Sequence, residues 1–285
     1  MSAAKATKAA SGAVGRLIAL IKETSSSLPA DVEAALRRAA RREDAGSPAR
    51  TALKTILENT AIARSSGTPL CQDTGTLAFY IASSLKHRYT PEAVRAAVAR
   101  ATELGCLRRN CLDSVSQRSY DDNCGPGAPV IHYGDDFNGV TLLMKGGGSE
   151  NMSRQYSLPD EPLGAGRDLD GVRRCILDAV WRAQGYGCAP GILGVCIGGD
   201  RASSFETAKR QLLRPLGDSA DSTALRKLER TALLEANSLG IGPMGLGGKT
   251  TLLGVKIAAL ARLPASFFVT VAYMCWACRR GHIDD

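Results

Sequence analysis

The segment Ile192-Leu-Gly-Val-Cys-Ile-Gly-Gly199 decides the fold class of this chain. Its first six residues form a short apolar run that ends in two glycines, which is typical of a buried strand. A helical pattern follows from about Phe205 to Leu213. A buried strand followed closely by a helix is the unit from which helix-covered sheets are built. The segment therefore predicts an α/β fold of the mixed α+β kind.

Similar strand and helix patterns recur on both sides of this segment. One-turn spacing of apolar residues predicts helices that begin at Thr90, Gly171 and Thr223. Short apolar runs predict four more strands, at Leu77–Ala82, Pro129–Tyr133, Gly139–Met144 and Phe267–Tyr273.

The beginning of the chain has a different pattern. From Gly12 to about Arg64 apolar residues recur at one-turn spacing, which predicts a helical N-terminal region over residues 1–64. Its first 12 or so residues are rich in Ala, Ser and Lys, and we expect them to be loose. Residues 65–285 are then expected to form the mixed-sheet part of the molecule.

Length and composition fit a globular chain of enzyme size. The chain has 285 residues, of which 44% are hydrophobic and 22% charged, so a disordered chain is excluded. The longest apolar run, Ala265–Trp276, is shorter than the roughly 20 residues that span a bilayer. Ser266 and Thr270 also interrupt it. We therefore expect no membrane partner.

The charge balance favours an anionic small molecule as the ligand. The formal net charge is +8, from 36 Lys and Arg against 28 Asp and Glu. The basic residues are scattered, and aromatic residues make up only 5% of the chain. Because the two kinds do not interleave, there is no platform on which nucleic-acid bases could stack. We expect no nucleic acid partner.

The nine cysteines suggest a reducing, cytoplasmic location. Their number is odd, and the chain has no signal peptide with a short apolar core and a small-residue cleavage site. Disulfides are therefore not expected. Cys275 and Cys278 form a single CxxC pair without a second pair at zinc-ribbon spacing, so metal ligation and core packing are equally good interpretations of it.

Glycine is concentrated where the helix and strand patterns stop. Such loops let the backbone approach a ligand closely, although any one of them could be only a tight turn. A P-loop is excluded because its first glycine would fall at Pro243, and no dinucleotide fingerprint is present. The clusters are Cys71–Thr76, Lys145–Asn151, Gly187–Gly191 and Gly240–Lys249.

Three cysteines stand at strand or loop ends next to glycine or polar residues. They are Cys71, Cys188 and Cys275. Three thiolates from separate loops suit a cubane iron–sulfur cluster whose fourth iron has no protein ligand. An iron with an open position can act as a Lewis acid on a hydroxyl or carboxylate group.

Taken together, four strings resemble the class I fumarase and L-tartrate dehydratase family. They are Cys71-Gln-Asp-Thr-Gly-Thr76, Lys145-Gly-Gly-Gly-Ser-Glu-Asn151, Gly240-Ile-Gly-Pro-Met-Gly-Leu-Gly-Gly-Lys249 and Cys275-Trp-Ala-Cys-Arg-Arg280. The resemblance runs from about Leu53 to Arg280. It is closest to the alpha subunit of the two-subunit forms, which corresponds to the N-terminal domain of the single-chain forms.

The resemblance implies an oxygen-sensitive hydro-lyase with a [4Fe–4S] cluster that Cys71, Cys188 and Cys275 hold. In sequence these residues are far apart, so only the fold can bring them together. Cys278 is not part of the implied set.

The resemblance also implies the substrate contacts. Gln72 and Asp73 match the family's substrate-contacting pair, and Asp73 is the candidate for proton transfer. Arg108 matches a carboxylate-binding arginine, although Arg109 beside it leaves the register open by one residue. Gly148 matches a backbone contact to substrate.

The implied reaction is the reversible hydration of fumarate, a C4 dicarboxylate, to (S)-malate. The further residues of the family's site belong to a beta subunit, so the resemblance implies a beta partner and an α2β2 assembly. Three alternatives stay open. They are an L-tartrate dehydratase alpha subunit, a non-catalytic structural subunit of the same fold, and an electron-transfer protein with Cys278 as a fourth cluster ligand.

Overall fold

The computed structural model describes residues 3–285, with side chains from residue 12 onward. The helices are α1 (Ala3–Ser26), α2 (Ala30–Arg42), α3 (Pro48–Ser66), α4 (Pro91–Glu103), α5 (Gly147–Asn151), α6 (Leu169–Ala183), α7 (Arg201–Gln211) and α8 (Thr223–Ser238). The strands are β1 (Thr76–Ala82), β2 (Cys111–Leu112), β3 (Ser119–Tyr120), β4 (Val130–Gly134), β5 (Val140–Lys145), β6 (Arg154–Ser157), β7 (Gly191–Ile197), β8 (Leu252–Ala259), β9 (Phe268–Met274) and β10 (Arg279–Ile283). Mixed sheets with helices confirm the predicted fold class.

The chain forms two compact units that are interleaved in sequence. Unit 1 comprises the chain up to Pro29, Glu58–Gly147 and Arg279–Asp285. Unit 2 comprises Ala30–Leu57 and Gly148–Cys278. No described helix combines the length and the apolar character that crossing a bilayer requires.

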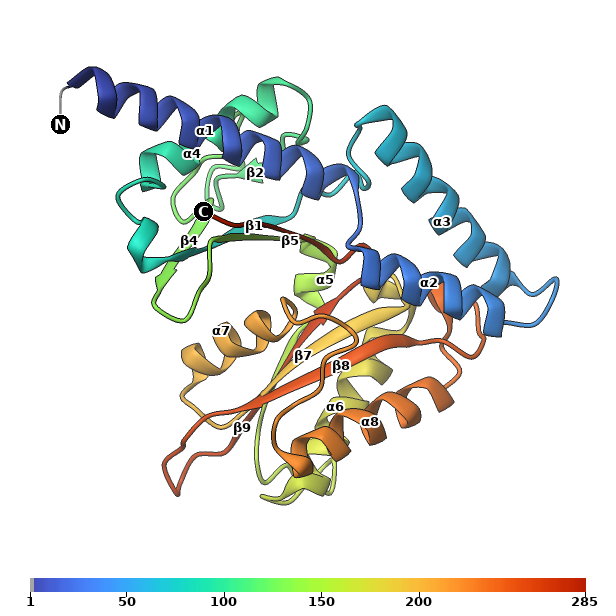
Figure 1. Cartoon of the computed structure of the whole chain (residues 1–285). Helices are drawn as coiled ribbons and strands as arrows, with labels where there is room; N and C mark the ends of the chain where they lie inside the picture. Colours follow the sequence, from blue (N-terminus) through green and yellow to red (C-terminus); the bar gives the residue numbers. More distant parts are fainter. Residues whose placement is uncertain (1–2) are drawn as a thin grey trace. The chain divides into compact units, whose positions relative to one another are not determined.

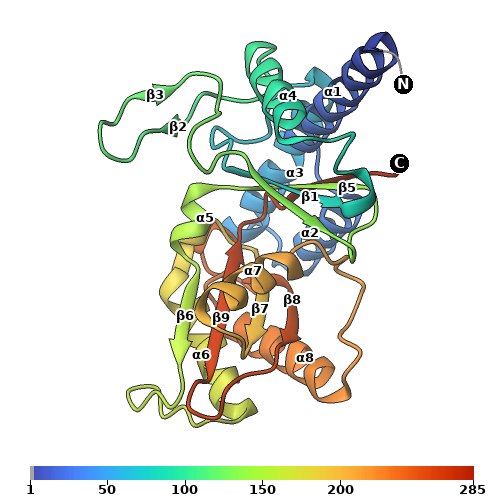
Figure 2. The same cartoon turned by 90° about the vertical axis from the view of Figure 1, so that its left-hand side faces the viewer.

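Unit 1 is built on a four-stranded sheet of order β10-β5-β1-β4 (Figures 1 and 2). Helices α1 and α4 pack together against one face of this sheet. Leu77, Phe79 and Ile81, which alternate along β1, are buried in the core that the helices cover. The β1–β4 pair is parallel, and the β1–β5 and β5–β10 pairs are antiparallel. The sheet thereby fixes the start of β1 beside the end of β5.

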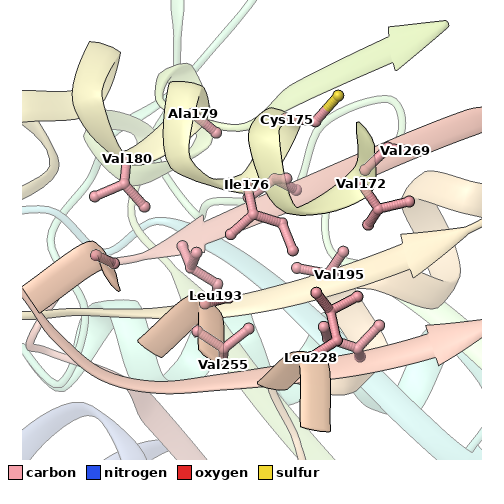
Figure 3. Close-up of a cluster of buried hydrophobic side chains, with 14 of the residues drawn as sticks. Val172, Cys175, Ile176, Ala179, Val180, Leu193, Val195, Leu228, Val255 and Val269 are labelled. Atoms are coloured by element: carbon pink, nitrogen blue, oxygen red, sulfur yellow. The ribbon is translucent and has the colours of Figure 1, made fainter. Parts of the chain in front are cut away.

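Unit 2 is built on a second sheet, of order β6-β9-β7-β8. Helices α6 and α8 lie on one face of it and α7 lies on the other (Figure 1). Figure 3 shows Ile176 of α6 over Leu193 and Val195 of β7. On the opposite face α7 comes so close that a Cβ on Gly194 would lie 2.1 Å from the carbonyl oxygen of Ala208. A strand covered on both faces accounts for the unbroken apolar run of β7.

Side-chain caps fix the helix starts. The hydroxyl of Thr90 accepts a hydrogen bond from the Ala93 N–H at 3.3 Å, which confirms the predicted start of α4. Helix α7 begins at Arg201, four residues before the prediction, because Asp200 caps it and accepts from the Ala202 N–H at 2.8 Å.

Some elements differ from the sequence-based expectation. Helix α1 begins at Ala3, inside the segment expected to be loose, because Ala and Lys are strong helix formers. The sequence pattern also does not predict β8, in which Gly254 and Lys256 interrupt the apolar run. Lys256 is nevertheless buried, and its ammonium group donates to the carbonyl oxygens of Leu216 and Asp218.

Candidate active site

The loop that leads into β1 carries Asp73 and is held against the end of β5. Gly75 has a φ of +74°, and a Cβ there would lie 2.4 Å from the carbonyl oxygen of Lys145, so only glycine fits. Asp73 consequently lies beside Gly146, where a Cβ would be 2.8 Å from its Oδ2. The predicted proton-transfer group and the start of the predicted glycine turn therefore lie together in unit 1.

A hydrogen-bond network holds the backbone of Arg108 next to this loop. The Thr74 hydroxyl accepts from the Arg108 N–H and donates to the Arg108 carbonyl oxygen, both at 2.9 Å. The buried Asn123 donates to the same carbonyl at 2.9 Å and accepts from the N–H groups of Asn110 and Cys111 at 3.1 and 3.2 Å. The side chain of Arg108 is exposed, and no described residue pairs with it. Arg108 is therefore available to an anion from outside the loop.

A cavity of about 350 Å³ opens within unit 1 beside Asp73. Its lining includes Asn110, Asn123, the turn Pro126–Pro129 and Gly147. The space suits a small molecule, and a carboxylate with two amides supplies the few polar groups that orient a ligand in such a site.

Cys71 lies two residues before Asp73. It is a half-buried free thiol, and the N–H of Asp73 points at its Sγ at 3.5 Å. Its neighbour Leu70 is anchored on both sides, to the carbonyl oxygen of Ser25 at 2.8 Å and to the side chain of Asn59 at 3.1 Å. The position of Cys71 in unit 1 is therefore fixed.

In unit 2 the fold brings together two half-buried cysteines, Cys188 and Cys275, which form no disulfide and are 87 residues apart in sequence. Cys188 precedes β7 and has a φ of +50°, which side-chain-bearing residues adopt rarely and often at functional sites. Cys275 follows β9, the antiparallel neighbour of β7. The N–H of Trp276 donates to the carbonyl oxygen of Cys188 at 3.2 Å.

Other thiols of the chain are less suited to hold a metal. Burial raises the pKa of Cys124 to about 11 and that of Cys175 to about 12. Burial also raises the pKa of Cys111 and of Cys196. Burial at these four positions therefore disfavours the thiolate form that a metal ligand must adopt.

The glycine-rich loop Gly240–Lys249 packs on the segment around Cys188. The N–H of Met244 donates to the carbonyl oxygen of Ala189 at 2.8 Å. Gly242 has a φ of +69°, and a Cβ there would lie 1.7 Å from the carbonyl oxygen of Gly247. The loop is thus a tight structure that supports one of the predicted ligands.

Glu43, just beyond the end of α2, anchors this loop from the other side. Its carboxylate is buried and accepts the N–H of Lys249 with both oxygens, at 2.9 and 3.1 Å. A Cβ on Gly248 would lie 2.7 Å from Oε2 of Glu43, so the loop has no room for a side chain there. The neighbouring Asp44 pairs with the ammonium group of the same Lys249 but is 76% exposed.

We expect Glu43→Ala to lower the free energy of unfolding by about 1–3 kcal/mol, because the Lys249 N–H loses a buried acceptor. Asp44→Ala is the matched control, since it removes an exposed ion pair to the same lysine and should cost at most about 1 kcal/mol. Urea unfolding of the two variants measures the difference. Equal losses would contradict the anchoring role of Glu43.

The predicted site residues fall into two groups. Cys71, Gln72, Asp73 and Arg108 lie in unit 1, where the hydrogen bonds above hold them on neighbouring loops. Gln72 is exposed. Unit 2 contains Gly148, Cys188 and Cys275. Gly148 begins the second segment of this unit and is exposed. Among the described residues, no three Cys, His, Asp or Glu side chains gather in the arrangement of a metal site.

Three supporting residues are not predicted from the sequence. Asn123 acts through contacts with residues 12 to 15 positions earlier in the chain and Glu43 through its contact with Lys249, and the sequence gives no signal of these contacts. Tyr273 reads as an ordinary core residue of β9, yet its ring lies against the loop that carries Cys188. The only sequence signal for any of them is the Asn-Cys-Gly string at 123–125, which is typical of a turn.

Comparison with known proteins gives a consistent result. The family model described as fumarate hydratase (Fumerase) matches residues 16–284. A putative class I fumarate hydratase of Geobacillus stearothermophilus is 48% identical over 275 residues, which are 93% of this chain and 54% of that protein. The chain thus spans about half the length of this relative.

Two further relatives are alpha subunits by name. A putative L(+)-tartrate dehydratase subunit alpha of Methanocaldococcus jannaschii is 33% identical over 93% of this chain and 94% of its own length. The L(+)-tartrate dehydratase subunit alpha of Escherichia coli is 31% identical over 80% of this chain and 76% of its own length. With the family model covering nearly the whole sequence, the chain belongs to the fumarate hydratase (Fumerase) family.

Proposed function

We propose that this chain is the alpha part of a hydro-lyase that adds water reversibly to a C4 dicarboxylate, with fumarate and (S)-malate as the reacting pair. The observation that carries the proposal is the cavity in unit 1, which has Asp73 in its lining. The adjoining loop presents the unpaired cation of Arg108. The 48% identity to a putative class I fumarate hydratase supports fumarate as the substrate.

The residues have complementary tasks in this reaction. Water addition places a hydroxyl on one alkene carbon and a proton on the other, and the reverse reaction removes both. Arg108 binds one substrate carboxylate through two parallel hydrogen bonds. Asp73 passes the proton, directly or through a partner hydroxyl, and Gln72 and the backbone of Gly148 orient the substrate. The tight turn at Gly75, which has no room for a side chain, holds Asp73 in place for this transfer.

Cys71, Cys188 and Cys275 are the residues that would hold a [4Fe–4S] cluster. Two observations fit this assignment: the contact between the Cys188 and Cys275 segments, and the N–H that faces the sulfur of Cys71. A cluster with three thiolate ligands supplies one iron that is open to act as a Lewis acid on the leaving hydroxyl. Free thiols throughout the described chain suit the reducing cytoplasm, in which we place the enzyme.

A partner completes the site in this proposal. One arginine cannot bind both carboxylates of a diacid, and this chain spans only 54% of the putative class I fumarate hydratase that it resembles. The relatives named as alpha subunits imply a beta subunit, which would supply the remaining cations. We assign the pair to an α2β2 assembly.

The alternative substrate is tartrate, which loses water to give oxaloacetate. It is favoured by the two relatives named as tartrate dehydratase alpha subunits, since this chain aligns with 94% and 76% of their lengths.

The experiment compares the chain alone with the complex isolated through a tag from the cell that produces it, both anaerobically and loaded with iron and sulfide. The complex should hydrate fumarate at about 1 per second or faster, whereas the chain alone should not. Tartrate in both enantiomers serves as the competing substrate. Turnover of fumarate by the chain alone at that rate would overturn the split site, and an inactive complex would overturn the assigned reaction.

A further inference from the structure

Tyr273 is the last but one residue of β9 and is almost completely buried, with 1% of its surface exposed. It pairs with Leu193 of β7, so its ring lies on the α6 and α8 face of the sheet. Its N–H donates to the hydroxyl of Ser153 at 3.2 Å. The backbone of β9 therefore fixes the direction of this side chain.

Two glycines make room for the ring of Tyr273. A Cβ on Gly187 would lie 2.4 Å from its Cε1 and 2.9 Å from its hydroxyl oxygen. A Cβ on Gly191 would lie 2.6 Å from the same hydroxyl oxygen. Since these glycines flank Cys188 at both ends of its loop, the hydroxyl lies directly under that loop.

The hydroxyl of Tyr273 differs in its contacts from that of Tyr156 in the same sheet. No hydrogen bond joins it to another residue in the described part of the chain. In contrast, the half-buried Tyr156 of the same sheet donates to Asp178 at 2.8 Å.

We propose that the Tyr273 hydroxyl donates a hydrogen bond to the thiolate pair of Cys188 and Cys275 when these residues hold iron. The inference rests on the proposed function, because it takes the two cysteines as cluster ligands. A proton donor near ligand sulfur stabilises the more negatively charged, reduced state of a cluster and strengthens the hold on its iron. Tyr273 is thus a positioning residue that adjusts the reduction potential of the cluster and the retention of its iron. It does not contact the substrate.

The test compares Tyr273→Phe with Tyr156→Phe in the complex, reconstituted with iron and sulfide without oxygen. Both variants lose one tyrosine hydroxyl of unit 2 and keep the ring. Tyr156→Phe also removes the hydrogen bond to Asp178, so its general loss of stability should be at least as large. The readouts are the midpoint potential of the cluster, followed by electron paramagnetic resonance of the reduced form, and the rate of iron release in air.

Tyr273→Phe should shift the midpoint potential to more negative values and release iron several-fold faster, while Tyr156→Phe should match the unchanged protein. Equal behaviour of both variants would overturn the role of Tyr273 and leave the cluster assignment intact. An unchanged protein that takes up no iron would overturn the proposed cofactor and this inference with it.

Discussion

Cys188→Ser should remove iron and activity from the complex together. The residue is a half-buried cysteine that forms no disulfide, and its backbone has a left-handed conformation beside the segment of Cys275. Serine preserves the size of the side chain but binds iron much less strongly than a thiolate does, so the backbone should keep its shape while the cluster is lost. Iron and sulfide analysis after anaerobic reconstitution measures the loss, and circular dichroism checks the fold.

Cys124→Ser is the matched control for this change. Cys124 is also a half-buried free thiol, but burial raises its pKa to about 11 and it lies in unit 1 outside the proposed ligand set. The control should keep its iron and its hydratase activity. If Cys188→Ser kept both as well, the chain would be better described as a structural subunit of the same fold.

Asp73→Asn should lower the rate constant for hydration by about 10²–10⁴-fold, the usual contribution of a positioned acid–base group. The amide has the same shape as the carboxylate, so the loop and the contact with Gly146 should persist. Because the group acts in proton transfer, kcat should fall much more than substrate affinity. Steady-state assays of the complex over a range of fumarate concentrations separate the two effects.

Asp121→Asn supplies the comparison for Asp73. It is an exposed aspartate of unit 1 that forms no hydrogen bond or ion pair with another described residue. Its activity should equal that of the unchanged complex. A rate for Asp73→Asn within a factor of about three of this control would be too small for an acid–base role, and the proton would then have to be handled elsewhere.

The sequence predicts the fold class and most long elements because their apolar patterns are strong. The buried run of β7 and the capped start of α4 are read directly from local residues. Strands such as β8 and β10 are missed because their signals are mixed. In β8, Lys256 is buried on carbonyl oxygens that come from a distant loop, a compensation that no local pattern reveals.

The candidate site is also only partly predictable from the sequence. Asp73 and Cys188 are suggested by glycine-rich strings and by family resemblance, and the fold gives each a fixed local setting. The sequence gives no signal for the residues that hold Asp73 and Cys188 in place. Glu43 binds the N–H of Lys249, which lies 206 residues later in the chain. Contacts over such separations are set by the tertiary structure, and no periodicity or motif in the sequence indicates them.

In the proposed site, three cysteines leave one iron of the cluster free for substrate chemistry. Mössbauer spectroscopy of the iron-loaded complex, before and after addition of fumarate, tests this arrangement. The proposed arrangement predicts that the signal of one iron of the cluster changes on addition of fumarate while the others stay as they were. Four irons that do not respond to fumarate, together with a reversible redox couple and no hydratase activity, would contradict it and favour an electron-transfer cluster with Cys278 as its fourth ligand.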